Sequence, residues 1–223
     1  MADAKFEFIL FDLIGTTISD SSKGESLILE AFQKSFQANG FEISYDHINQ
    51  QRGRIKKEAI KIILKENTKD ERLINKVYTD FIKLLNLSKS NFAEINGAKN
   101  VFRELKQKGI KIGVGSGLPL VFMHEIINQA GWQDINFDYL GSSEELGKGR
   151  PDPIMINDAQ RKLEIHDRSR ILKIGDTFVD IQEGKNAGVL TAGVLTGTQN
   201  RQTLEKFNPD YIFEDIKGLI GII

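Results

Sequence analysis

The chain has 223 residues, of which 40% are hydrophobic and 27% are charged, and it contains no cysteine. These proportions are those of an ordinary globular protein, and the missing cysteines exclude disulfides and thiolate metal sites. A net charge of −1 argues against a nucleic-acid surface. No stretch reaches the roughly 18 apolar residues of a membrane helix, and MADAKFEF lacks the apolar segment of a secretion signal. We therefore expect a cytoplasmic protein that binds neither nucleic acid nor membrane.

The first predicted element is a buried strand, FEFILF, which leads directly into Asp12. From about residue 24 to residue 89 the chain has no proline and shows the apolar spacing of helices throughout. After about residue 96, short apolar runs alternate with helical stretches, a pattern that predicts an α/β fold with a doubly wound parallel sheet. The runs expected to be strands are IKIGVGS (110–116), FDYLGSS (137–143), RILKIGD (170–176), LTAGVLT (190–196) and DYIF (210–213).

The helical block separates the first strand from the other strands of the predicted sheet. The economical arrangement is a core domain made of residues 1–16 and 92–223, with residues 17–91 inserted as a helical cap domain. Two crossings between these parts, near residues 19–24 and 86–92, are the expected hinges. The sequence leaves open whether the protein forms a homodimer.

Polar residues follow the predicted strands, and ligands of open parallel sheets bind beyond the carboxyl ends of the strands. Asp12, Ser116 and Asp176 each end a strand, with Arg150 and Asp180 in nearby segments. Each of these residues alone is often a turn former, a helix cap or a surface charge. Together, carboxylates, hydroxyls and a cation at one edge suit a Mg²⁺ ion and a phosphoryl group.

Four segments, in this order, resemble the motifs of the haloacid dehalogenase (HAD) superfamily, whose members mostly hydrolyse phosphate compounds. FILFDLIGTT (8–17) is similar to the first motif, hhhhDxDxT, and IGVGSG (112–117) to the second. GKGRPDP (147–153) is similar to the third, and IGDTFVDIQEGKNAGV (174–189) to the fourth, GDxxxDxxxGxxAG. The resemblance covers nearly the whole chain and implies a Rossmann-like core with a C1-type cap.

The resemblance also implies how a phosphoryl group would be held and transferred. Asp12 would be the nucleophile that forms an aspartyl-phosphate, which divides one difficult displacement into two easier ones. Thr16, Ser116 and the N–H of Gly117 would hold phosphoryl oxygens. Arg150 would neutralise charge on the nucleophile and the phosphate.

A second implication is a Mg²⁺ ion. Its ligands would be the carboxylates of Asp12 and Asp176 and the main-chain carbonyl of Ile14. Asp180 would support the ion through water or a hydrogen bond.

The side chain at position 14 departs from most phosphatases of the superfamily, which have a second aspartate there as general acid and base. Such help is worth roughly 10²–10⁴ in rate, and Ile14 cannot supply it. FDLIGTT is similar to FDWAGTT of the phosphonoacetaldehyde hydrolases (phosphonatases), which also lack this aspartate. Those enzymes cleave a C–P bond through a Schiff base on a lysine in a Met-Gly-x-x-Lys segment of the cap. Gly53 and Lys56 have that spacing here.

Three residues differ from the phosphonatase pattern: Arg52 replaces a methionine, Ala59 a catalytic histidine and Ser22 a cysteine. One alternative is therefore an ordinary phosphomonoester phosphatase, similar to phosphoglycolate phosphatases, with Lys56 as a substrate-binding cation. Another is a non-catalytic protein that binds phosphorylated ligands. Lys56 is equally compatible with an exposed charge on a helix that carries further lysines.

Two other classes fit less well. Metal-free dehalogenases of the superfamily lack the metal aspartate, which this chain retains as Asp176. A dinucleotide site requires G-x-G-x-x-G, and Leu118 occupies the place of the third glycine. The histidines are interpreted as structural. The sequence thus predicts a phosphonatase-like hydrolase that acts on a small phosphorylated or phosphonate substrate.

Overall fold

The computed structural model describes residues 5–22, 25–51, 53–65 and 70–223. Its largest sheet has six strands in the order β10-β9-β8-β1-β6-β7, and every neighbouring pair is parallel. The strands are β1 (Phe8–Asp12), β6 (Lys111–Ser116), β7 (Tyr139–Ser142), β8 (Ile171–Gly175), β9 (Leu190–Val194) and β10 (Tyr211–Phe213). The predicted α/β fold with a parallel, doubly wound sheet is confirmed.

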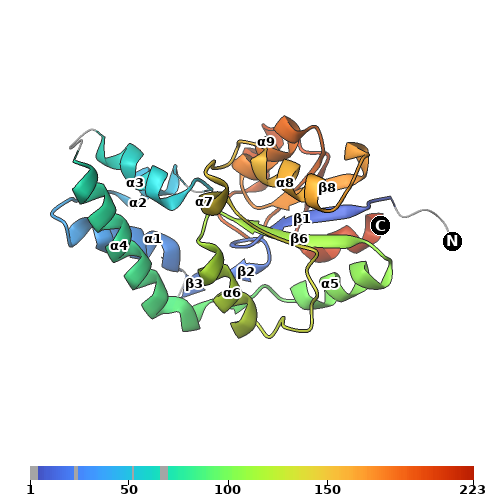
Figure 1. Cartoon of the computed structure of the whole chain (residues 1–223), viewed down its shortest axis with the longest axis horizontal. Coiled ribbons are helices and arrows are strands. Elements are labelled where there is room, and N and C mark those ends of the chain that lie inside the picture. Colours follow the sequence, from blue (N-terminus) through green and yellow to red (C-terminus); the bar gives the residue numbers. More distant parts are fainter. Residues whose placement is uncertain (1–4, 23–24, 52, 66–69) are drawn as a thin grey trace.

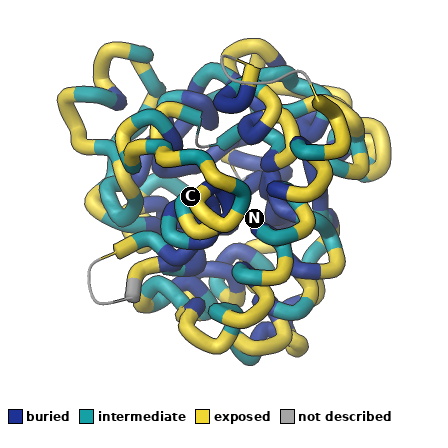
Figure 2. Tube along the Cα trace, turned by 90° about the vertical axis from the view of Figure 1, so that its left-hand side faces the viewer, coloured by how far each residue is buried: buried dark blue, intermediate teal, exposed yellow. Residues whose placement is uncertain are grey.

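Helices cover both faces of this sheet, with α8 and α9 on one side and α5 and α6 on the other (Figure 1). Because both faces are covered, β1 and β8 are buried along their whole length, which explains their continuous apolar sequences. The helices of this part are α5 (Ala98–Gln107), α6 (Leu120–Gln129), α7 (Ser143–Leu146), α8 (Ile154–Lys162), α9 (Phe178–Ala187) and α10 (Arg201–Glu205). Short 3₁₀ turns are η1 (Lys89–Asn91), η2 (Arg168–Arg170) and η3 (Ile216–Ile222). Buried residues gather in the interior and exposed residues at the periphery (Figure 2).

Helices α1 (Leu27–Gln37), α2 (Tyr45–Asn49), α3 (Lys56–Leu64) and α4 (Glu71–Ser88) form a separate group beside the sheet (Figure 1). The rings of Phe32 on α1 and Phe81 on α4 lie 4.3 Å apart between centroids, so the two helices share an apolar seam. The chain enters and leaves this group through β2 (Ile18–Ser19) and β5 (Ala93–Glu94), which pair with each other. None of the described helices is both long and apolar enough to cross a membrane.

The expectation of helix throughout residues 24–89 is wrong where short strands and turns separate the helices. A short pairing of β3 (Ser21–Ser22) with β4 (Glu25–Ser26) precedes α1. The helical pattern also stops between α2 and α3, where Gly53 has a φ of +85°. A left-handed backbone is readily adopted by glycine and ends a helix. The resulting loop approaches the carboxyl ends of the core strands.

Candidate active site

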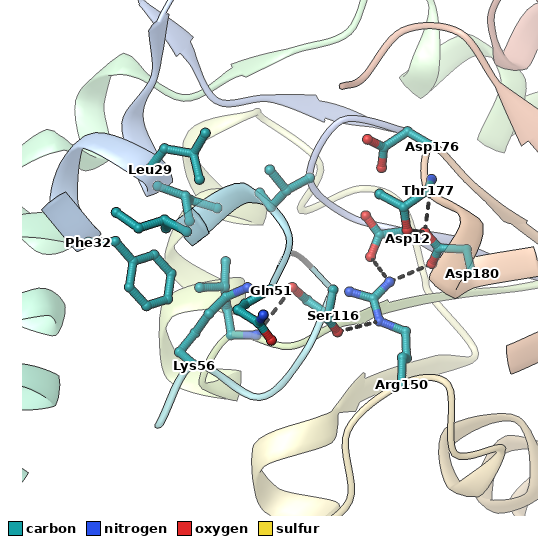
Figure 3. Close-up of a pocket in the computed structure, with 15 residues that line it drawn as sticks. Asp12, Leu29, Phe32, Gln51, Lys56, Ser116, Arg150, Asp176, Thr177 and Asp180 are labelled. Carbon is teal, nitrogen blue, oxygen red and sulfur yellow. Dashed lines mark hydrogen bonds and ion pairs between the residues drawn. The ribbon is translucent and has the colours of Figure 1, made fainter. Parts of the chain in front are cut away.

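A closed pocket lies where the carboxyl ends of β1, β6 and β8 meet the helical group (Figure 3). Its core-side lining is Asp12, Ile14, Ser116, Leu118, Arg150, Asp176, Thr177 and Asp180. Its lining from the helical group is Ile28, Leu29, Phe32, Ile48, Gln51, Gly53 and Lys56. The cavity has a volume of about 30 Å³, enough for about two water molecules. Pockets for small molecules usually have volumes of about 300–1,000 Å³, so this cavity is far smaller than such a site.

Asp12 ends β1 and is 3% exposed. The Nη1 of Arg150 lies 2.5 Å from Oδ1 of Asp12 and 2.5 Å from Oδ1 of Asp180, as the dashed lines of Figure 3 show. Burial raises the pKa of Asp12, and the positive charge of Arg150 opposes this rise. Burial alone would also raise the pKa of Asp180, but Arg150 and Lys173 hold it at about 2. The positive charge of Arg150 thus favours the charged forms of both buried carboxylates.

The position of Asp180 follows from the start of α9. Thr177 precedes this helix, and its N–H donates a hydrogen bond of 3.3 Å to Oδ2 of Asp180 as part of a capping box. The Oγ1 of Thr177 donates a second hydrogen bond, of 2.5 Å, to the same oxygen. Lys173 on β8 lies 3.1 Å from Asp180 and 3.2 Å from Glu183, and both Lys173 and Glu183 are fully buried. Lys173 and Glu183 are not among the residues that the sequence predicts for the site. A lone charge inside the apolar run RILKIG was a signal that could have revealed the pair, because buried charges require partners.

Asp176 follows β8, and its Oδ2 accepts a hydrogen bond of 3.1 Å from the N–H of Thr198. Gly15 and Gly197 approach this carboxylate so closely that a Cβ would lie 2.6 Å and 1.9 Å from Oδ2. Asp12, Asp176 and Asp180 offer oxygen atoms within 4.8 Å of one another. Clustered carboxylate oxygens are the donors that hard cations prefer, so the residues present fit a Mg²⁺ ion.

Lys56 is the first residue of α3 and is 6% exposed. It lines the same pocket as Asp12, so the interpretation of Lys56 as an exposed charge is wrong. Lys57 and Lys61, on the same helix, are the exposed ones. The loop before Lys56 also contacts the core, because the carbonyl oxygen of Gly53 accepts a hydrogen bond of 3.1 Å from Nε of Arg150.

Two glycines of the core allow this loop to approach. A Cβ on Gly117 would lie 2.6 Å from the carbonyl oxygen of Arg54, and a Cβ on Gly149 would lie 3.0 Å from the backbone N of Ile55. Real Cβ atoms essentially never approach a neighbour within 3.0 Å. The absence of a side chain at Gly117 is therefore a condition of this arrangement, whereas a Cβ at Gly149 would require only a small shift of its neighbour.

The remaining predicted phosphate-binding residues have different places. Ser116 ends β6 and lines the pocket, and its Oγ accepts a hydrogen bond of 3.3 Å from the N–H of Leu118. Thr16 is fully buried, and its Oγ1 has no hydrogen-bond partner among the described residues. Neither Thr16 nor Gly117 is among the residues that line the pocket. Their contacts with a phosphoryl group stay predictions.

Of the three positions that differ from the phosphonatase pattern, only Ala59 is fully described by the structure. Arg52 lies outside the described residues, as do residues 23 and 24 of the expected hinge and the side chain of Ser22. Ala59 is buried in α3. The histidines, His47 on α2, His124 on α6 and His166, are not among the described residues that line the pocket.

The model of one family, the haloacid dehalogenase-like hydrolases, matches residues 9–194. The chain belongs to this family. It is 30% identical, over 207 residues, to a phosphonoacetaldehyde hydrolase of Bacillus cereus, covering 87% of this chain and 77% of that protein. It is 29% identical, over 230 residues, to a phosphonoacetaldehyde hydrolase of Bacillus mycoides, covering 96% of this chain and 86% of that protein.

Solved structures share the HAD fold with this chain. One is a phosphonoacetaldehyde hydrolase-like protein from Oleispira antarctica, with a TM-score of 0.84, 22% identity and coverage of 98% of this chain and 92% of that chain. Another, described as a predicted phosphoglycolate phosphatase, comes from Haemophilus somnus, with a TM-score of 0.82, 20% identity and 98% coverage of both chains. The predicted HAD resemblance, including its phosphonatase-like character, is confirmed. The protein is a HAD-family hydrolase of the phosphatase and phosphonatase type.

Proposed function

We propose that the protein is a Mg²⁺-dependent hydrolase that removes the phosphoryl group of a small organophosphorus compound in the manner of phosphonatases. The observation that carries this proposal is the composition of one closed pocket. A buried amine, Lys56, shares the pocket with the buried carboxylate of Asp12. A hydrocarbon, Ile14, lines the same pocket where a general acid would stand. The side chain that can react with the leaving group is therefore Lys56 of the helical group, and not the residue at position 14.

Asp12 attacks phosphorus and carries the phosphoryl group as an aspartyl-phosphate, which water then hydrolyses. Arg150 pairs with Asp12 and offers further N–H donors to phosphoryl oxygens. Ser116 and the N–H of Gly117 hold these oxygens, together with Thr16. A Mg²⁺ ion held by Asp12, Asp176, Asp180 and the carbonyl of Ile14 would supply positive charge to the nucleophile and the phosphoryl group.

Lys56 provides an electron sink for the leaving carbon. Its neutral amine condenses with the aldehyde of the substrate, releasing water and forming an iminium group after protonation. When the C–P bond breaks, phosphorus passes to Asp12 and the bonding electrons flow toward the iminium nitrogen. The departing carbon then needs no proton from position 14 at that moment, which agrees with the presence of Ile14.

We also propose that residues 1–16 and 92–223 act as a core and residues 17–91 as a cap that closes over the site. The β2–β5 pairing, where the chain enters and leaves the helical group, supports this division. Closure expels water from the pocket, which strengthens electrostatic interactions and protects the intermediate.

A second candidate is an ordinary phosphomonoester phosphatase in which Lys56 binds the distal part of the substrate. The observation that favours it is the methyl side chain of Ala59, which is 1% exposed at the position where phosphonatases have a catalytic histidine. Both candidates use Asp12 as the nucleophile. They differ in whether Lys56 forms a covalent bond.

Intact-mass spectrometry after incubation with phosphonoacetaldehyde and borohydride tests the Schiff base. The wild type and Lys57→Ala, which changes an exposed neighbour, should gain the mass of a reduced adduct, and Lys56→Ala should not. Asp12→Asn should abolish phosphate release, and chelation of Mg²⁺ should do the same reversibly. An adduct that persists in Lys56→Ala refutes the role of Lys56. Phosphate release from esters without any adduct establishes the second candidate.

A further inference from the structure

The side-chain amide of Gln51 lines the pocket but has no part in the mechanism above. Its Oε1 is buried and has no hydrogen-bond partner among the described residues. The backbone of the same residue is engaged in the turn after α2. Its N–H donates to the carbonyl of Ile48 at 3.0 Å, and its carbonyl accepts from the N–H of Arg54 at 3.4 Å. The turn therefore fixes the backbone from which the amide extends into the pocket.

The apolar surroundings of Oε1 of Gln51 make its lack of a hydrogen-bond partner unfavourable in free energy. The helical side of the pocket is lined chiefly by hydrocarbon side chains, those of Ile28, Leu29, Phe32 and Ile48. Buried polar atoms in native proteins are nearly always hydrogen-bonded, and one without a partner loses its interaction with water without compensation. A ligand that brings a hydrogen-bond donor to this position would remove that loss.

Position in the pocket decides which part of a substrate Gln51 meets. In the view of Figure 3, Gln51 is drawn between Lys56 and Ser116, away from the carboxylates of Asp12 and Asp180. The phosphorus end belongs at Asp12, according to the proposed function on which this inference rests. Because ionised phosphoryl oxygens only accept hydrogen bonds, the acceptor Oε1 of Gln51 has to find its donor on the carbon chain.

We infer that Gln51 determines specificity by accepting a hydrogen bond from a hydroxyl group on the carbon chain of the substrate. The substrate class is a short organophosphorus aldehyde that is apolar along its chain and whose distal carbon carries a hydroxyl only in the addition product. An aldehyde acquires such a hydroxyl when the amine of Lys56 adds to it: the N–C bond forms, the C=O double bond becomes single, and a proton moves to oxygen. Gln51 would then hold the addition product in the orientation from which water leaves.

Two stable phosphonates that differ by one hydroxyl group test this inference. Calorimetry with Mg²⁺ present would measure the Kd of ethylphosphonate and of 2-hydroxyethylphosphonate for the wild type, Gln51→Met and Gln50→Met. Methionine keeps the length of the side chain without its acceptor, and Gln50 is an exposed neighbour outside the pocket lining. The hydroxyl compound should bind the wild type and Gln50→Met about tenfold more tightly than ethylphosphonate. In Gln51→Met the advantage should fall below about twofold, with the Kd of ethylphosphonate little changed.

The ratio of the two Kd values is taken within each variant, so a loss of folded protein affects both ligands equally and leaves the ratio unchanged. Equal affinities in the wild type, or a preference that survives in Gln51→Met, would overturn the inference and leave the proposed function standing. Failure of both phosphonates to bind the wild type would refute the proposed function and the inference with it.

Discussion

Replacement of Gly117 by alanine should penalise closure of the helical group over the active site. The added Cβ would lie 2.6 Å from the carbonyl oxygen of Arg54, far inside the 3.4 Å at which ordinary contact begins. The obstacle is backbone, so relief requires the loop and the core to separate. Overpacking of this kind costs about 1–3 kcal/mol, which corresponds to about a 5–150-fold loss in kcat/KM.

Phosphate release from the best available substrate, together with thermal unfolding, would measure this effect. The melting temperature should change little, because the open form relieves the clash. Gly149→Ala places its Cβ 3.0 Å from a backbone atom and should cause a smaller loss. Gly221→Ala has no atom within 4 Å of its Cβ and should leave both quantities at the wild-type value.

Two results would refute this reasoning. Wild-type kcat/KM in Gly117→Ala would mean that turnover does not pass through the closed arrangement. A large fall in melting temperature with unchanged kcat/KM would mean that the contact between Gly117 and Arg54 belongs to the permanent fold.

Three further predictions concern other contacts around the site. Lys173→Met should lower the free energy of unfolding by about 3–5 kcal/mol in urea titrations, because Glu183 stays buried without its cation. Adding Glu183→Leu should restore most of this loss, and a double variant less stable than the single one would contradict us. The penalty of Lys173→Met should also shrink as the pH falls toward 4.5, the ordinary pKa of the carboxyl. Burial raises the pKa of the Glu183 carboxyl above that value, so protonation of Glu183 at low pH stabilises the folded state relative to the unfolded state. This stabilisation is lost as the pH rises through the raised pKa. Tyr78→Phe removes the hydrogen bond from α4 to Glu144 on α7 and should lower kcat/KM about 3–10-fold at unchanged melting temperature; an unchanged kcat/KM would exclude this contact from closure. Ile14→Asp should raise phosphomonoesterase activity, and no gain would mean that an acid is supplied elsewhere or that the leaving group is a different one.

The sequence was sufficient for the sheet and for the residues at its strand ends. Strands buried on both faces read as continuous apolar runs, and parallel strands present their carboxyl ends at one edge. Asp12, Ser116 and Asp176 could therefore be assigned to one site before any coordinates were known. Their convergence follows from the topology alone.

The burial of Lys56 could not be predicted in this way. It depends on a break at Gly53 inside an apolar helical pattern, and a single glycine in such a pattern is often tolerated within a helix. It also depends on docking of the loop against Arg150, which is distant in sequence. The pairing of Lys173 with Glu183 was missed for the same reason, because side-chain contacts across elements leave no periodic signal.

Ile14 fits the electrostatics of the pocket as well as the proposed chemistry. A second carboxylate at this position would join a cluster in which burial already raises the pKa of Asp12 and the charge of Asp180 raises it further. More negative charge would raise the pKa of Asp12 further, a cost that the general acid gained in Ile14→Asp has to outweigh. Ile14 instead lines the pocket together with Leu29 and Phe32 of the helical group and adds no charge to it. Stabilisation of the leaving group is then the task of Lys56, on the opposite side of the pocket.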